Sequence, residues 1–150
     1  APQRDRLRRA IKAGVTVVAG SDNYINLKMP STLLAPQRDR LRRAIKAGVT
    51  VVAGSDNYIN LKMPQGTAAK HNLFAYAQAG MPNAEVLQAA TIRAATLIGP
   101  RTRLGVLKAG MFADVIAVQG NPLEDIMALE RVTFVMKDGK VHVAAMGSRQ

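Results

Sequence analysis

Residues 49–56 read VTVVAGSD, an apolar run followed directly by a serine and an aspartate. The run from 49 to 54 is apolar and rich in β-branched residues, which is typical of a strand buried on both faces of a parallel sheet. Ser55 and Asp56 follow at once, so a carboxylate stands where the predicted strand ends. The question is whether this aspartate performs chemistry.

The same stretch occurs a second time, because residues 1–30 recur without a change as residues 35–64, separated by STLL. Natural structural repeats diverge, so identity over this length points to a recent duplication or to laboratory construction. The order helix, strand, helix, strand predicts a β-α-β unit in which strand 15–20 connects through helix 37–47 to strand 49–54. Such crossovers place their strands parallel.

Helical patterns precede and follow the predicted strand. The segment PQRDRLRRAIKAG at 36–48 is amphipathic, with Pro36 near the first turn and Gly48 suited to a left-handed C-terminal cap. After Pro64, the pattern predicts a helix over 68–79 and a second helix over 83–98 that stops at Gly99. From residue 103 short strands and turns are expected instead, and Asp138-Gly139 between two alternating runs predicts a hairpin.

Composition narrows the class of protein. The chain has 150 residues and no cysteine, which excludes disulfides, iron–sulfur clusters and thiol catalysis. No apolar run reaches the length of a membrane span and the first ten residues do not resemble a secretory signal, so a cytoplasmic protein without membrane contact is expected. The net charge is +11, but most of it lies in the two repeats and no aromatic residues interleave with it. Non-specific polyanion binding is therefore expected, and specific nucleic-acid recognition is not.

Four motifs in order carry a resemblance to a known family: AGVTVVAGSD, AQAGMPNAEVLQAATIRAATLIG, RLGVLKAGMFADVIAVQGNPLEDI and VMKDGKV. Together they resemble the C-terminal portion of metal-dependent hydrolases of the amidohydrolase superfamily, closest to imidazolonepropionase-like and prolidase-like members. The resemblance implies a (β/α)₈ barrel with its catalytic groups at the C-terminal strand ends. It makes 49–54 the eighth barrel strand, and Asp56 the carboxylate that binds a metal ion and accepts a proton from its bound water.

The expected fold class is α/β: a partial (β/α) barrel segment with a small parallel sheet, covering helices and a C-terminal antiparallel β portion. Residues 1–99 would hold the duplicated helix–strand units and two helices. Residues 100–150 would form a β-rich segment that resembles the small β-sandwich of the family.

The expected metal site is incomplete. A catalytic metal needs about three protein ligands, and neither histidine, His71 or His142, matches a ligand position of the family. Two parallel strands would bring Asp22 and Asp56 to one sheet edge, where with His71 they could hold a weakly bound zinc or manganese ion. The alternative is that both carboxylates stay hydrated and cap the strand ends, and that His71 is an ordinary surface histidine.

Three functions follow as hypotheses. The first is a weak metal-dependent hydrolase that cleaves an amide, ester or phosphotriester bond of a small-molecule substrate, with Asp56 and Asp22 as catalytic residues. The second is a catalytically silent fragment, natural or engineered, that self-assembles, because the open edges of a partial sheet favour burial in a homo-oligomer. The third is a basic polyanion-binding protein.

Overall fold

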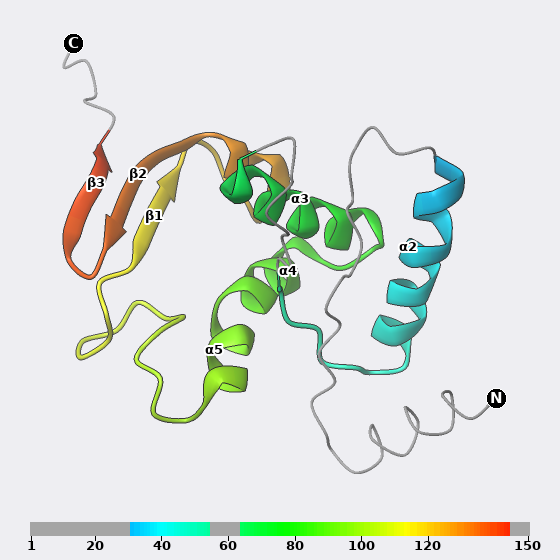
Figure 1. The fold of residues 1–150 in the computed structure, drawn as a ribbon, viewed down its shortest axis with the longest axis horizontal. Helices are drawn as coiled ribbons and strands as arrows, with labels where there is room; N and C mark the ends of the chain where they lie inside the picture. Colours follow the sequence, from blue (N-terminus) through cyan, green and yellow to red (C-terminus); the bar gives the residue numbers. More distant parts are fainter. Residues whose placement is uncertain (1–30, 55–63, 145–150) are drawn as a thin grey trace.

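The computed structural model describes residues 31–54 and 64–144 of the chain (Figure 1). The described elements follow the chain in this order: α2 (Ser31–Lys46), α3 (Gln65–Gln78), α4 (Asn83–Ala90), α5 (Ile92–Ile98), β1 (Val115–Val118), the 3-10 helix η1 (Ile126–Glu130), β2 (Val132–Lys137) and β3 (Lys140–Ala144). Figure 1 shows α2 and the sheet on opposite sides of α3, α4 and α5. None of the described helices is both long and apolar enough to cross a membrane.

Helix α2 begins earlier than the sequence predicts. It starts at Ser31 rather than at residue 37, and it takes in the STLL linker and keeps Pro36 inside the helix. The linker contains two leucines, which are good helix formers, while Pro36 leaves one backbone hydrogen bond of the helix unmade. The end of α2 is as predicted, because Gly48 adopts a positive φ of 76° just beyond it.

The three valines of residues 49–54 are buried as predicted, whereas Thr50 and Gly54 are exposed, and the stretch does not form the predicted parallel sheet. Val51 and Val52 are each only 1% exposed. The Ala53 N–H donates to the carbonyl of Ala89 on α4 at 2.9 Å, and no strand is formed by 49–54. The sheet in the described part of the chain consists of the three C-terminal antiparallel strands. The correction has a physical reason, since a strand requires a neighbouring backbone and 49–54 has a helix beside it instead.

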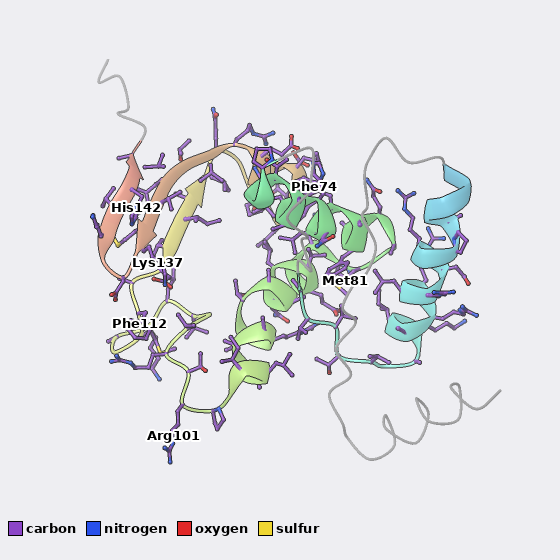
Figure 2. All side chains as sticks on the ribbon, viewed as in Figure 1. Phe74, Met81, Arg101, Phe112, Lys137 and His142 are labelled. Carbon is purple, nitrogen blue, oxygen red and sulfur yellow. The ribbon has the colours of Figure 1, made fainter. Side chains whose placement is uncertain are left out.

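Helices α3 and α4 both begin directly after a proline, at Pro64 and Pro82. They pack with the buried stretch and with η1 into one core, and Figure 2 labels two of its members, Phe74 and Met81. The buried cluster comprises Val51, Phe74, Tyr76, Met81, Val86, Ile126 and Leu129. The core is aliphatic with few aromatic residues, as the composition predicts.

The helix predicted over 83–98 is in fact two helices. Thr91 interrupts it with φ −124° and ψ −98°, and α5 starts one residue later. The Thr91 hydroxyl donates to the Leu87 carbonyl at 2.7 Å, which satisfies an acceptor at the end of α4. Beyond the break, Leu97 and Ile98 of α5 are 46% and 72% exposed, although the apolar spacing continues through them.

The C-terminal segment confirms the predicted hairpin. β2 pairs antiparallel with both β1 and β3, in the order β1-β2-β3. Asp138 and Gly139 form the turn between β2 and β3, with positive φ values of 49° and 75°, as a two-residue hairpin turn requires. Asp114 holds this turn, because its carboxylate accepts from the Asp138 N–H at 2.7 Å and pairs with Lys137.

Candidate functional site

The candidate site lies where the buried stretch 49–54 ends, against one face of α3. The side-chain amide of Asn72 donates to the carbonyl of Gly54 at 3.2 Å. Tyr76 lies one helical turn further along α3, on the same face, and is 3% exposed. The Asn72 side chain thus holds the last described residue before Ser55 and Asp56, and Tyr76 lies buried nearby.

A pocket of about 280 Å³ opens beside Gly54. Lys70 supplies the charged group of its lining, and Asn72 supplies a side-chain amide. The remaining lining residues are small or apolar: Ala53, Gly54, Ala69, Leu73 and Ala90. A concave wall whose described residues are mostly apolar, with Lys70 as their cation and Asn72 as their amide, suits a small ligand that carries an anionic or carbonyl group.

Tyr76 brings a polar group into this apolar region. Its hydroxyl is buried and has no hydrogen-bond partner among the described residues. Burial raises the pKa of the Tyr76 hydroxyl, and a weak interaction with the backbone of Gly54 partly offsets this. The hydroxyl therefore stays protonated at neutral pH, as a neutral donor close to the end of the buried stretch.

The predicted site residues are only partly placed by the structure. Asp22 and Asp56 lie outside the described residues, so their predicted roles stay predictions. His71 lies on α3, half-buried, with its ring centroid 6.0 Å from that of Phe74. Its Nδ1 is buried and has no hydrogen-bond partner within residues 31–54 and 64–144. His142 lies in β3, in the terminal hairpin as expected.

The described residues do not fit a metal site by themselves. Nowhere in 31–54 or 64–144 do three or more histidine, cysteine, aspartate or glutamate side chains gather closely enough to hold an ion. The metal role predicted for His71 would therefore require ligands from other parts of the chain or from another chain, since about three protein ligands are needed.

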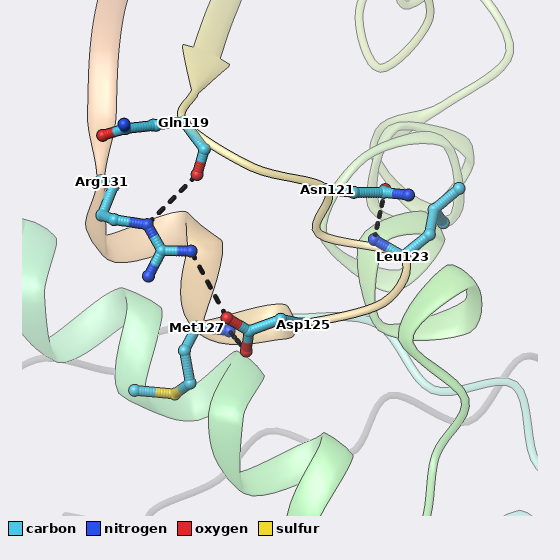
Figure 3. Close-up of polar contacts among 6 residues, drawn as sticks. All are labelled: Gln119, Asn121, Leu123, Asp125, Met127 and Arg131. Atoms are coloured by element: carbon cyan, nitrogen blue, oxygen red, sulfur yellow. Dashed lines mark hydrogen bonds and ion pairs between the residues drawn. The ribbon is translucent and has the colours of Figure 1, made fainter.

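Two charged residues of the C-terminal half, Asp125 and Arg131, have structural partners. Asp125 caps η1 by accepting from the Met127 N–H at 2.9 Å, and its second oxygen pairs with Arg131 at 3.4 Å (Figure 3). The Arg131 side chain also donates to the carbonyl of Gln119 at 3.2 Å. These contacts close the turn between β1 and η1, so they account for the charges without a ligand.

Sequence reasoning missed Lys70, Asn72 and Tyr76 as site residues. The available signal was the i, i+4 spacing of Asn72 and Tyr76 on the face of a helix that is otherwise apolar. A buried asparagine needs hydrogen-bond partners, so its place on that face predicts a backbone contact. The sequence does not say that the contact is with Gly54.

Comparison with known proteins identifies the family. The family model described as the Amidohydrolase family matches residues 23–142. The chain belongs to the amidohydrolase family. The resemblance inferred from the motifs is thereby confirmed, and amidohydrolases typically bind divalent metals. The matched range covers α2 to α5 and most of the C-terminal sheet, including the wall of the pocket.

Several amidohydrolases with known structures resemble this chain. A solved amidohydrolase superposes over 95% of the chain and 38% of its own length, with a TM-score of 0.75 and 26% identity. A prolidase complexed with N-methylphosphonate-L-proline superposes over 93% of the chain and 38% of its own, with a TM-score of 0.74 and 26% identity. In sequence, the ochratoxinase of Aspergillus niger is 43% identical over 80 residues, which is 51% of this chain and 17% of the ochratoxinase. The chain therefore spans well under half the length of these relatives.

Proposed function

We propose that this chain provides the C-terminal part of an amidohydrolase that cleaves an amide bond, and that Asp56 is its acid–base residue. The observation that carries the proposal is the fixed end of the buried stretch beside the pocket. Asn72 holds the Gly54 carbonyl there. Because Asp56 follows by two residues, chain connectivity keeps its Cα within about 7 Å of the Cα of Gly54.

The pocket supports an amide or peptide as the substrate class. Lys70 at its wall offers a cation to a substrate carboxylate, and the apolar residues around it suit a small side chain or ring. A similar prolidase was solved with a proline phosphonate, and a Xaa-Pro dipeptidase is similar over 93% of the chain with a TM-score of 0.64 and 28% identity. We propose dipeptides with a C-terminal proline as the first substrates to test.

Within this proposal, a carboxylate at position 56 takes a proton from the attacking water and passes it to the departing nitrogen. We propose that the attacking water is activated by a zinc or manganese ion. Asp56 and further ligands outside the described residues would bind this ion. The side chains of Asn72 and Lys70 would orient the backbone and the substrate, respectively.

The test is hydrolysis of Xaa-Pro dipeptides by the purified chain and by the variant Asp22→Asn/Asp56→Asn, which removes both copies of the carboxylate. Loss of a general base lowers the rate by about 10²–10⁴-fold, so activity should fall to background. The matched control is Asp5→Asn/Asp39→Asn, which makes the same charge change in both repeats. Asp39 is exposed and pairs with Arg43 on α2.

Activity that survives in the first variant, or that falls equally in the control, would contradict a role for Asp56. Elemental analysis of the same preparations tests the ion. Bound zinc or manganese should be present in the unmodified chain and in the control, and lost with both aspartates.

A second proposal, self-assembly, is favoured by an apolar row across the sheet. Ile116, Val135 and Val143 lie opposite one another on three adjacent strands. Ile116 and Val143 are 56% and 47% exposed. We propose that this row is buried in a homo-oligomer. Light scattering of Val143→Lys should then give a smaller mass than the unmodified chain, whereas Lys140→Glu at the hairpin turn should leave the mass unchanged.

A further inference from the structure

The surface that the second repeat covers in this structure is built by residues outside both repeats. Leu41 and Ile45 of α2 pack against the core cluster. Arg42 donates to the carbonyls of Ala79 at 3.2 Å and Gln78 at 3.5 Å, at the C-terminal end of α3. A cation there is favoured by the helix dipole. These contacts dock α2 on the end of α3 and on the core cluster.

The buried stretch docks on the same part of the molecule. Val51 enters the core cluster, the Ala53 N–H donates to Ala89, and the Gly54 carbonyl accepts from Asn72. The described contacts of the second repeat therefore involve α3, α4 and the core cluster, to which η1 contributes Ile126 and Leu129. None of these receiving elements belongs to the repeated sequence.

The first repeat carries the same docking side chains at the same spacing, because residues 1–30 equal residues 35–64. Arg4, Leu7, Arg8, Ile11, Val17, Ala19 and Gly20 correspond to Arg38, Leu41, Arg42, Ile45, Val51, Ala53 and Gly54. We propose that this surface is a binding site for the first repeat of the same chain as well, so that residues 4–20 exchange with residues 38–54 on it.

The ratio of the two docked forms follows from the connecting chain. The second repeat is joined to α3 through residues 55–64, whereas the first repeat is joined through residues 21–64, a connection about four times as long. The closure entropy scales as (3/2)RT ln n, so the longer connection is disfavoured by roughly tenfold. The second repeat therefore occupies the site in most chains, and the first repeat in about one in ten.

Urea unfolding of four chains tests the exchange. The first is unmodified, the second is Leu41→Ala/Val51→Ala, the third is Leu7→Ala/Val17→Ala, and the fourth carries all four substitutions. Truncating both side chains in a docked repeat lowers the ratio of folded to unfolded chain by more than about a hundredfold. With exchange, the second chain loses only about tenfold because the first repeat replaces the damaged one. The third chain loses almost nothing, and the fourth loses the full amount.

The proposal is overturned if the second chain loses as much as the fourth, because the first repeat then does not dock. It is also overturned if the third chain alone is strongly destabilised, since the first repeat would then have a separate site. A fourth chain that does not fold at all counts as full loss, and the comparison with the second chain still decides.

Cross-linking provides an independent measurement, because the chain has no cysteine. Arg38 donates to the Gln78 side chain at 2.6 Å, so a short bismaleimide should join Cys residues in Gln78→Cys/Arg38→Cys. Exchange predicts the same product in Gln78→Cys/Arg4→Cys, as a monomer, at roughly a tenth of the initial rate. The control is Gln78→Cys/Arg6→Cys, whose counterpart Arg40 is exposed on α2. A product formed only between chains, or no faster than in the control, would refute docking within the chain.

Discussion

Among the glycines that the structure describes, Gly105 is the one at which an added methyl group should be most damaging. It has a φ of +82°, and a Cβ built there would lie 2.8 Å from the Thr91 carbonyl oxygen and 2.9 Å from the Ala95 Cβ. The loop after α5 thus packs directly against the break between α4 and α5. In Gly105→Ala, the positive φ costs about 1–2 kcal/mol, and forcing the methyl group against the backbone adds about 1–3 kcal/mol. We expect the free energy of unfolding to fall by about 2–5 kcal/mol.

Gly110→Ala is the matched control, because Gly110 has a similar φ of +86° with nothing within 4 Å of the added methyl group. It should cost only the backbone term, about 1–2 kcal/mol. Urea unfolding followed by far-UV circular dichroism measures both variants against the unmodified chain. Equal losses in the two variants would show that the approach of Gly105 to Thr91 contributes nothing, and the packing argument would fail.

Three further predictions concern single side chains. The Lys137 ammonium and the Asp138 N–H lower the pKa of Asp114. The stability that the Asp114 carboxylate contributes is therefore present above the ordinary aspartate range and is lost as pH falls below about 4. Asp114→Asn should reduce the dependence of the free energy of unfolding on pH in this range. Burial raises the pKa of Tyr76, so the free energy of unfolding should fall as pH rises above about 10. Tyr76→Phe should remove this fall. At pH 7 the same variant should be as stable as the unmodified chain, or more stable by up to about 1 kcal/mol. Asp125→Ala should lose about 1 kcal/mol with the cap of η1, whereas Asp125→Asn, which keeps an acceptor, should lose less; equal losses would contradict the cap.

Local patterns predicted the parts of the fold that local interactions decide. The hairpin at Asp138-Gly139 and the cap at Gly48 were predictable because φ preference alone selects them. The break at Thr91 was not predictable, since the apolar spacing runs through it. The feature that accompanies the break is the close approach of Gly105, which is a tertiary contact. The parallel sheet was wrong for the described residues because an apolar, β-branched run signals burial as much as strand pairing. Val51 is buried against helices.

In the candidate site, too, residues in a local motif were predicted and residues placed by tertiary packing were not. Its aspartates were predicted from a family motif. Asn72, which holds the preceding backbone, and Tyr76, which lies buried beside it, come from a helix that follows later in the chain. Their role depends on how α3 packs against residues 49–54, and a contact over that sequence separation leaves no local pattern. The pocket with Lys70 depends on the same packing.

The proposed exchange changes how the two aspartates should be tested. Asp22 follows Gly20 as Asp56 follows Gly54, so whichever repeat is docked presents one carboxylate beside the pocket. Asp56→Asn should therefore leave about a tenth of the activity, carried by chains in which the first repeat is docked. Asp22→Asn should leave nearly all of it, and only the double variant should reach background. If both carboxylates instead served one ion together, either single variant would lose the activity completely. The residual rate of Asp56→Asn thus separates alternating carboxylates from a shared site, and a residual that disappears on adding Leu7→Ala/Val17→Ala assigns it to the first repeat.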